Sequence, residues 1–139
     1  MKYLVSLALI LAPITTVAAE DETSEWLYIT NDKDGTSVYA LRSDIMKGRS
    51  NQTRARVWVK LDHSRDKTTQ YRESKVLYEV NCPGQSFRSL SYHSYDTASN
   101  RVYSDNTTSS ITYIIPETVM ESVAIELCAD PAEDRRPSL

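Results

Sequence analysis

The stretch TRARVWVKLDH, residues 53–63, carries the clearest strand pattern in the chain. Its side chains fall into two alternating sets, with Ala55, Val57, Val59 and Leu61 in one and Arg54, Arg56, Trp58 and Lys60 in the other. Successive side chains of a β-strand point to opposite faces, so one face is apolar and the other is cationic with one aromatic ring. The pattern predicts a strand in a sheet of which only one face is covered.

The segments before and after this stretch predict further antiparallel strands. WLYIT (26–30) and TSVYAL (36–41) are separated by NDKDG (31–35), an Asn/Asp/Gly cluster that is typical of a hairpin turn. Three more strand-like segments follow, at residues 71–82, 86–95 and 101–105. Within the first of them, Val76, Tyr78, Val80 and Cys82 alternate with Lys75, Leu77, Glu79 and Asn81. The sequence therefore predicts about six strands.

Two segments break the strand pattern. RSDIMKGRSNQ (42–52) is predicted to be an irregular connection with at most one helical turn. After ITYIIP (111–116), the segment ETVMESVAIELCA (117–129) has no internal Gly or Pro, and its first turn is acidic. One helical face collects Val119, Met120, Val123 and Leu127. We therefore expect an α+β fold, in which a single antiparallel sheet of about six strands has a C-terminal amphipathic helix packed on one face.

The first 19 residues match a secretory signal peptide. Met1 and Lys2 precede an apolar run at 3–13 that is too short to span a bilayer, and the small residues VAA fit a cleavage site after Ala19. The exported chain would have 120 residues and no cysteine near its start for a lipid anchor. We expect a signal peptide at 1–19, one domain at 20–130 and a disordered tail at 131–139, located in the periplasm or at the cell surface without stable membrane insertion.

Charge excludes one class of partner. The chain of 139 residues has a net charge of −3 and an isoelectric point near 5.4, which disfavours nucleic acid because phosphate contacts need a cationic surface. The charge is uneven, however. Residues 42–75 hold ten Lys and Arg against four Asp and Glu, an excess of +6, whereas the rest of the predicted mature chain carries −10.

The cationic side of residues 53–63 is the candidate binding site. Arg54, Arg56, Trp58 and Lys60 would form a basic patch with one stacking ring, which suits an anionic glycan, a lipid head group or an acidic protein surface. The alternative is structural. In that case the acidic helix and termini neutralise the basic segment, or its charges form a solvated face that protects a sheet edge from aggregation.

The two cysteines, Cys82 and Cys128, predict one disulfide, as is common in an exported chain of this size. The bond would connect the end of a strand to the end of the C-terminal helix. A catalytic thiol is the alternative, although no CxxC spacing supports redox chemistry.

No motif in the sequence predicts catalysis, a metal or a cofactor. His63 and His93 are the only histidines, and no HExxH or CxxC spacing supplies the three or four ligands of a metal site. We interpret both as ordinary strand residues. A G-x-S-x-G elbow and a glycine-rich phosphate loop are also missing from the sequence, which leaves a pair of carboxylates as the enzymatic alternative. We expect a non-enzymatic protein without cofactors.

The order of landmarks along the chain resembles the bacterial surface-adhesin protein E family. The pattern begins at a tryptophan followed by an NDxDG-type turn, continues through a VWV strand and a strand that ends in a cysteine, and closes on YIIPETVMES and a second cysteine. The matching positions are Trp26, Gly35, Trp58, Cys82, Arg88, Leu90, Pro116 and Cys128. Two features depart from the pattern: Tyr113 stands where a Trp is usual, and no lipoprotein cysteine is present.

The resemblance implies a small antiparallel sheet with a C-terminal helix tied by a disulfide. It also implies binding of host matrix proteins and plasminogen, as in the namesake of the family, and self-association in some members, so that a homodimer is an open alternative. The sequence thus predicts a non-enzymatic exported envelope protein with a protein partner. The second interpretation is a periplasmic inhibitor or an accessory subunit of an envelope complex.

Overall fold

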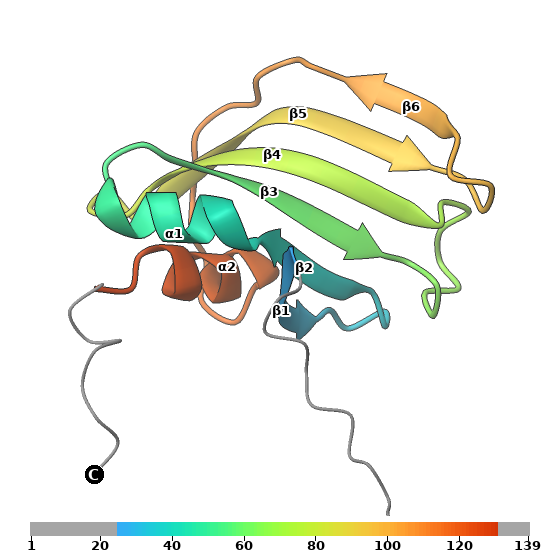
Figure 1. Cartoon of the computed structure of the whole chain (residues 1–139), viewed down its shortest axis with the longest axis horizontal. Helices are drawn as coiled ribbons and strands as arrows, with labels where there is room; N and C mark the ends of the chain where they lie inside the picture. The colour runs from blue at the N-terminus through green and yellow to red at the C-terminus, as the bar shows by residue number, and fades with distance from the viewer. Residues whose placement is uncertain (1–24, 131–139) are drawn as a thin grey trace, which may run out of the picture.

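A computed structural model describes residues 25–130 and arranges them as a curved sheet with two helices on one side (Figure 1). The predicted signal peptide at 1–19 and the predicted tail at 131–139 lie outside the described residues. In chain order the elements are β1 (Trp26–Asn31), β2 (Ser37–Leu41), α1 (Arg42–Ser50), β3 (Ala55–Asp62), β4 (Glu73–Asn81), β5 (Ser86–Tyr95), β6 (Arg101–Asp105), β7 (Thr112–Tyr113) and α2 (Val119–Leu127).

Antiparallel pairing joins the first six strands in the order of the chain, from β1 at one edge to β6 at the other. The two residues of β7 pair with the start of β5, along the edge of β5 that β6 occupies near its end. The predicted antiparallel sheet with its C-terminal helix is therefore confirmed. The segment 111–116 adds only β7 to this sheet.

The turn between β1 and β2 shows why NDKDG forms a hairpin. The Asp32 Oδ1 atom accepts hydrogen bonds from the backbone N–H groups of Asp34 and Thr36, at 2.8 and 3.0 Å. Gly35 has a φ of +89°, a backbone conformation that residues with a side chain rarely adopt. These local bonds and the glycine reverse the chain, so β2 returns alongside β1.

The core lies on the helix side of the sheet, where the alternation in residues 53–63 predicts it. Val57 and Val59 of β3 are almost completely buried. Around them the core cluster contains Val38, Ala40, Ala55 and Val80 from the strands, and Ile45, Met120, Val123 and Leu127 from the two helices. Because both helices cover the same face, the opposite face of the central strands has no helix over it (Figure 1).

Helix α1 corrects the prediction of an irregular connection at 42–52. Residues Arg42–Ser50 form a nine-residue helix, of which only Ile45 and Gly48 are buried. Two apolar positions among polar residues are too few to produce a helical pattern in the sequence. Tertiary contacts support the helix instead: the Asp44 carboxylate accepts a hydrogen bond of 2.9 Å from the backbone N–H of Trp58, at the point where β2 no longer pairs with β3.

The C-terminal helix α2 begins with a capping box and ends at the disulfide. The Thr118 hydroxyl accepts a hydrogen bond from the backbone N–H of Glu121, whose carboxylate accepts one from the N–H of Glu117. Cys128 follows the last helical residue and is bonded to Cys82, directly after β4, with a Cα–Cα distance of 5.7 Å. The predicted pairing is confirmed, and it fastens α2 to the sheet.

Removing the disulfide is expected to destabilise the fold substantially. The bond closes a loop of 46 residues, and loop-closure entropy assigns such a bond about 4 kcal/mol. We expect the double variant Cys82→Ala with Cys128→Ala to lose up to this amount of unfolding free energy in urea titrations. Reductant should lower the urea midpoint of the wild type and leave that of the variant unchanged. Equal urea midpoints of the two proteins without reductant would contradict the stabilising role of the disulfide.

Gly48 offers a test of the contact between α1 and α2. A Cβ atom at Gly48 would fall on the Cδ1 atom of Leu127, which is fully buried, and would lie 3.3 Å from the Cβ of Ala55. Helix propensity alone predicts that Gly48→Ala stabilises the protein by up to about 1 kcal/mol. We expect the opposite, a loss of about 1–3 kcal/mol, because the core must shift to accept the methyl group.

Thermal or urea unfolding of Gly48→Ala shows whether the substitution raises or lowers the unfolding free energy. Ser50→Ala is the matched control, since Ser50 is exposed in the same helix and its replacement tests propensity without the contact. Stabilisation by Gly48→Ala would show that α1 does not pack against α2 through this residue.

Candidate functional site

The face of the sheet without helices carries a row of side chains that crosses all six principal strands. The Cα register aligns these residues one after another: Tyr28, Tyr39, Lys60, Lys75, His93 and Ser104. Arg56 and Trp58 of β3 share this face because they alternate with the buried valines. Aromatic rings and cations thus lie together on a surface that is open to a partner.

The structure divides the four predicted binding residues into two groups. Arg56, Trp58 and Lys60 lie on the open face of β3, whereas Arg54 comes just before the strand begins. Arg54 lines a hollow of about 160 Å³ together with Glu79 and Arg88. Farther along the sheet, Lys60 lies beside the rings of Trp26 and Tyr39, and Trp58 lies beside the ring of His93. The joint role of the four predicted residues as a binding site stays a prediction.

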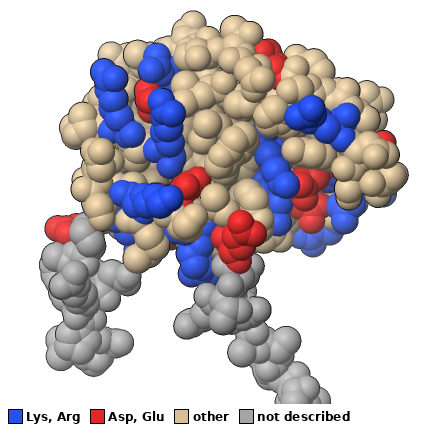
Figure 2. All heavy atoms as spheres, turned by 45° about the horizontal axis from the view of Figure 1, so that its top comes forward, with Lys and Arg blue, Asp and Glu red and all other residues tan. Residues whose placement is uncertain are grey.

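Glu79 of β4 neutralises part of the basic surface. Its Oε1 accepts hydrogen bonds from Nε and Nη2 of Arg88, at 3.0 and 2.7 Å, and its Oε2 lies 3.4 Å from Nε of Arg56. Burial by itself would raise the pKa of Glu79, but the bonds and charges of Arg88 and Arg56 hold this pKa below its ordinary value. On the face drawn in Figure 2, basic side chains lie in several separate groups, and acidic side chains lie beside most of these groups.

Lys60 and Lys75 are held among aromatic rings, and we call these five residues the lysine–aromatic cluster: Lys60, Lys75, Trp26, Tyr39 and Tyr95. The Nζ of Lys60 lies 4.8 Å from the ring centroids of both Trp26 and Tyr39. The Nζ of Lys75 lies 5.1 Å from the centroid of Tyr95 and 5.9 Å from that of Trp26. Attraction between an ammonium group and the face of a ring stabilises such pairs, so the cluster holds two cations close together.

A hollow of about 300 Å³ opens beside the cluster. It is lined by Glu25, Trp26, Leu41, Trp58, Lys75, His93, Tyr95 and Arg101. The ring of Trp58 lies 6.1 Å from that of His93, whose two ring nitrogens contact the hydroxyls of Ser91 and Ser104 at 2.8 and 2.9 Å. The arrangement combines flat apolar walls with cations, which suits a ligand that has both an apolar surface and a negative charge.

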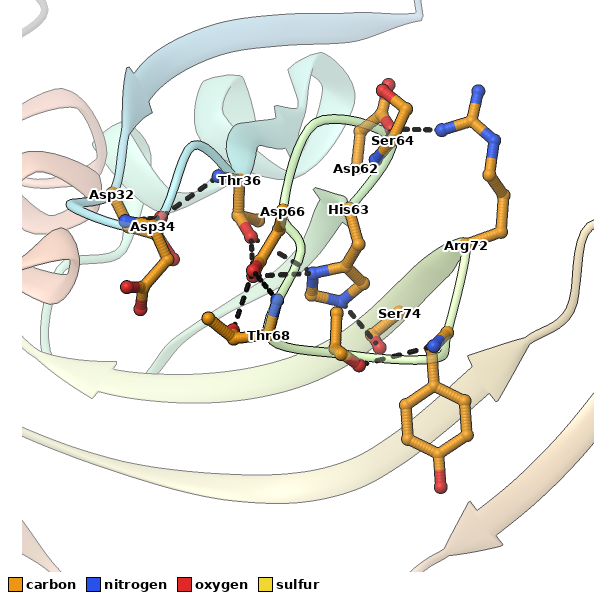
Figure 3. A network of polar contacts seen from close by, with 12 residues as sticks. Asp32, Asp34, Thr36, Asp62, His63, Ser64, Asp66, Thr68, Arg72 and Ser74 are labelled. Atoms are coloured by element: carbon orange, nitrogen blue, oxygen red, sulfur yellow. Dashed lines mark hydrogen bonds and ion pairs between the residues drawn. The ribbon is translucent and has the colours of Figure 1, made fainter.

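His63 is at the centre of a polar network under the loop between β3 and β4 (Figure 3). Its Nδ1 lies 3.0 Å from the Thr36 hydroxyl, and its Nε2 lies 3.0 Å from the Ser74 hydroxyl. Thr36 donates its single proton to Asp66 at 2.8 Å, so it accepts the bond from His63. Hydrogen bonds from Thr68 and Thr36 hold the pKa of Asp66 below its ordinary value.

The network contains an acid, an imidazole and a hydroxyl, as a hydrolase triad does. Its hydrogen bonds instead connect the loop after β3 to Thr36 and Ser74, and so stabilise the fold. Ser74 has no exposed surface, and its hydroxyl also contacts those of Ser94 and Tyr92, at 2.9 and 3.1 Å. A substrate therefore has no access to this oxygen. His63 follows the last residue of β3, so the expectation that both histidines are strand residues holds for His93 only.

Within residues 25–130, no three His, Cys, Asp or Glu side chains are grouped in a way that could hold a metal ion. None of the helices in this range is long and apolar enough to cross a membrane.

Sequence reasoning missed most of the cluster. Lys75 stands in the alternating segment 71–82, on the same side as Glu79, which is a usable signal. Trp26 and Tyr39 come from the N-terminal hairpin, and Tyr95 is the last residue of β5. Their approach to Lys60 and Lys75 depends on cross-strand register, which a local pattern does not contain.

These features define a small disulfide-bonded α+β domain with one open, aromatic and cationic sheet face. The family model of surface-adhesin protein E matches residues 26–129, from the first residue of β1 to just beyond the second cysteine. The chain belongs to the surface-adhesin protein E family. No match is found among curated proteins or among solved structures. Membership implies a surface-adhesin role, in a family whose members are typically non-enzymatic.

The ion pairs of Glu79 predict a specific pH dependence of stability. Because the folded-state pKa of Glu79 is lowered, its contribution is fully present above the unfolded-state value of about 4.3 and is lost as the pH falls through the folded-state value. At pH 7 we expect Glu79→Gln to unfold with about 1–2 kcal/mol less free energy than the wild type. The difference should shrink towards zero below about pH 4.

Urea titrations across this pH range check the expectation. Glu117→Gln is the control, because Glu117 is exposed and its side chain makes no ion pair with any residue in the described part of the chain. A deficit in Glu79→Gln that stays constant from pH 7 to pH 3 would show that the charge of Glu79 is not what stabilises this corner of the sheet.

Proposed function

We propose that the chain is an exported, non-enzymatic adhesin that binds a macromolecular partner, with host matrix proteins and plasminogen as the first candidates. Family membership supports the proposal. The structural observation that carries it is the helix-free face, where aromatic and cationic side chains follow one another across five strands, from β1 to β5. Export would use the predicted signal peptide at 1–19.

The chemistry of the open face supports a protein partner with acidic groups at its contact surface. Exposed arginines bind carboxylates through paired N–H groups, and aromatic rings add buried area at little cost in conformational entropy. Arg54, Arg56, Trp58 and Lys60 remain the proposed contact residues. Since Arg56 already has Glu79 as a partner at 3.4 Å, its attraction to a ligand is weaker than that of a free guanidinium.

A periplasmic inhibitor or an accessory subunit of an envelope complex is the second candidate. Cell fractionation separates the candidates. Protein on intact cells that captures plasminogen or laminin supports the adhesin, whereas protein confined to the periplasm supports the inhibitor or subunit.

Removing two cations from the open face is expected to weaken partner binding. The double variant Arg54→Ala with Arg56→Ala should bind immobilised laminin or plasminogen about fivefold less tightly at low salt, since an exposed charge contributes about 0.2–1 kcal/mol. The loss should diminish as salt is raised, because screening weakens the same contacts in the wild type. Surface plasmon resonance with the mature domain, at several salt concentrations, measures both effects.

The matched control removes the same charge elsewhere. Lys33 and Lys67 are exposed residues of the two loops at the opposite end of β3, so Lys33→Ala with Lys67→Ala should leave binding nearly unchanged. Equal losses in the two double variants would show that net charge, and not the open face, governs binding. An unaffected Arg54→Ala with Arg56→Ala variant would remove these two residues from the interface.

A further inference from the structure

We propose that the hollow beside the lysine–aromatic cluster is a binding site for an acidic sugar residue of a glycan. The sugar carboxylate would meet the ammonium group of Lys75 and the guanidinium of Arg101, and its ring would lie against Trp58 and Tyr95. This inference rests on the proposed function, because it names a ligand class for the same open face. It commits to a glycan, and an acidic peptide becomes one outcome of the test.

Excess positive charge lies beside the hollow. Lys60 and Lys75 are direct cross-strand partners, an arrangement in which two like charges destabilise a sheet. The shared ring of Trp26 offsets part of this repulsion, and Glu73 lies 3.4 Å from the Nζ of Lys75. Lys60 makes no ion pair with any residue that the structure describes. An incoming anion would remove the remaining repulsion.

The rim of the hollow adds to this charge. Arg101, at the start of β6, is exposed, and its side chain makes no ion pair within residues 25–130. Lys60, Lys75 and Arg101 together face two carboxylates, those of Glu25 and Glu73, which leaves an excess of one positive charge. The balance therefore favours an anionic ligand, and Lys75 and Arg101 come from different strands, so a carboxylate could lie between them.

An apolar surface lies between these cations. Trp26, Trp58 and Tyr95 supply three aromatic rings to one hollow of about 300 Å³, which is the lower end of the size range for small-molecule sites. A pyranose ring has one face made of C–H groups and a rim of hydroxyls, so it matches flat apolar walls with a polar edge. An extended acidic peptide would need a longer groove and has no such face. A single uronic acid unit satisfies both halves of the site.

The rings are also held in position before any ligand arrives. Both nitrogens of His93 contact serine hydroxyls, which orients the imidazole that lies against Trp58. Lys60 lies over the rings of Trp26 and Tyr39. A site whose walls are already ordered loses less conformational entropy on binding. This ordering distinguishes the hollow from a surface where mobile side chains meet by chance.

The two tryptophans of the chain make the test unusually clean. Trp26 and Trp58 are the only tryptophans, and both line this hollow, so intrinsic tryptophan fluorescence reports on this site alone. The probe is a hyaluronan tetrasaccharide, which carries glucuronate carboxylates, titrated into the purified mature domain. Neutral chitotetraose and a tetraglutamate peptide are the comparison ligands, one without the carboxylate and one without the ring.

We expect a saturable fluorescence change with the hyaluronan tetrasaccharide and about tenfold weaker binding, or none, with either comparison ligand. Lys75→Met, which keeps the apolar stem, and Arg101→Ala, at an exposed position, should each weaken binding by about tenfold. Lys33→Ala is the control and should bind like the wild type. Circular dichroism confirms that each variant is folded.

Three outcomes would overturn the inference: no response to the acidic tetrasaccharide, an equal response to chitotetraose, or tighter binding of tetraglutamate, which would point to a peptide site. Failure here is distinguishable from failure of the proposed function. If laminin or plasminogen binding persists without any glycan response, only the glycan site falls. If the tetrasaccharide binds and neither laminin nor plasminogen does, the site stands without the wider proposal.

Discussion

The apolar side of β3 must be kept from water, and both helices meet this requirement from the same side of the sheet. Val57 and Val59 pack against a cluster that contains residues of α1 and α2. Gly48 lets the helices approach each other, and the Cys82–Cys128 bond fastens α2 to the end of β4. Because every helix in the described part of the chain lies on one side, the other side is left to Arg56, Trp58 and Lys60. The helix-free face is thus a consequence of how the core is covered.

The cations of this open face are stabilised in two different ways, by ion pairs and by contacts with aromatic rings. Near the start of β3, Glu79 binds Arg88 and Arg56, which lowers the local positive field and holds the guanidinium groups in place. Farther along the sheet, Lys60 lies against two rings and makes no ion pair with any described residue, so its charge is stabilised without being cancelled. Lys75 has both ring contacts and an ion pair with Glu73. The second region is therefore the one with charge left to attract an anion.

The sequence predicts those parts of the molecule that depend on local pattern. Alternation in residues 53–63 and 71–82, the NDKDG turn and the capped segment before Cys128 indicate the strands, the hairpin and α2, all of which the structure contains. Helix α1 could not be predicted from a local pattern, because it is stabilised by contacts of Asp44 with Trp58 and of Gly48 with Leu127. The charge partner of Arg56 and the rings around Lys60 come from other strands, so the surroundings of these basic residues could be found only from the cross-strand register.

Side-chain footprinting shows whether a partner binds the helix-free face. Hydroxyl-radical oxidation of the mature domain, with and without plasminogen or laminin, compares Trp58, Tyr39 and Tyr95 on the open face with Met46 of α1 and Ile125 of α2, which are 58% and 64% exposed. We expect protection of the three rings and unchanged oxidation of Met46 and Ile125. Protection of the two helix residues with no change on the sheet would contradict it.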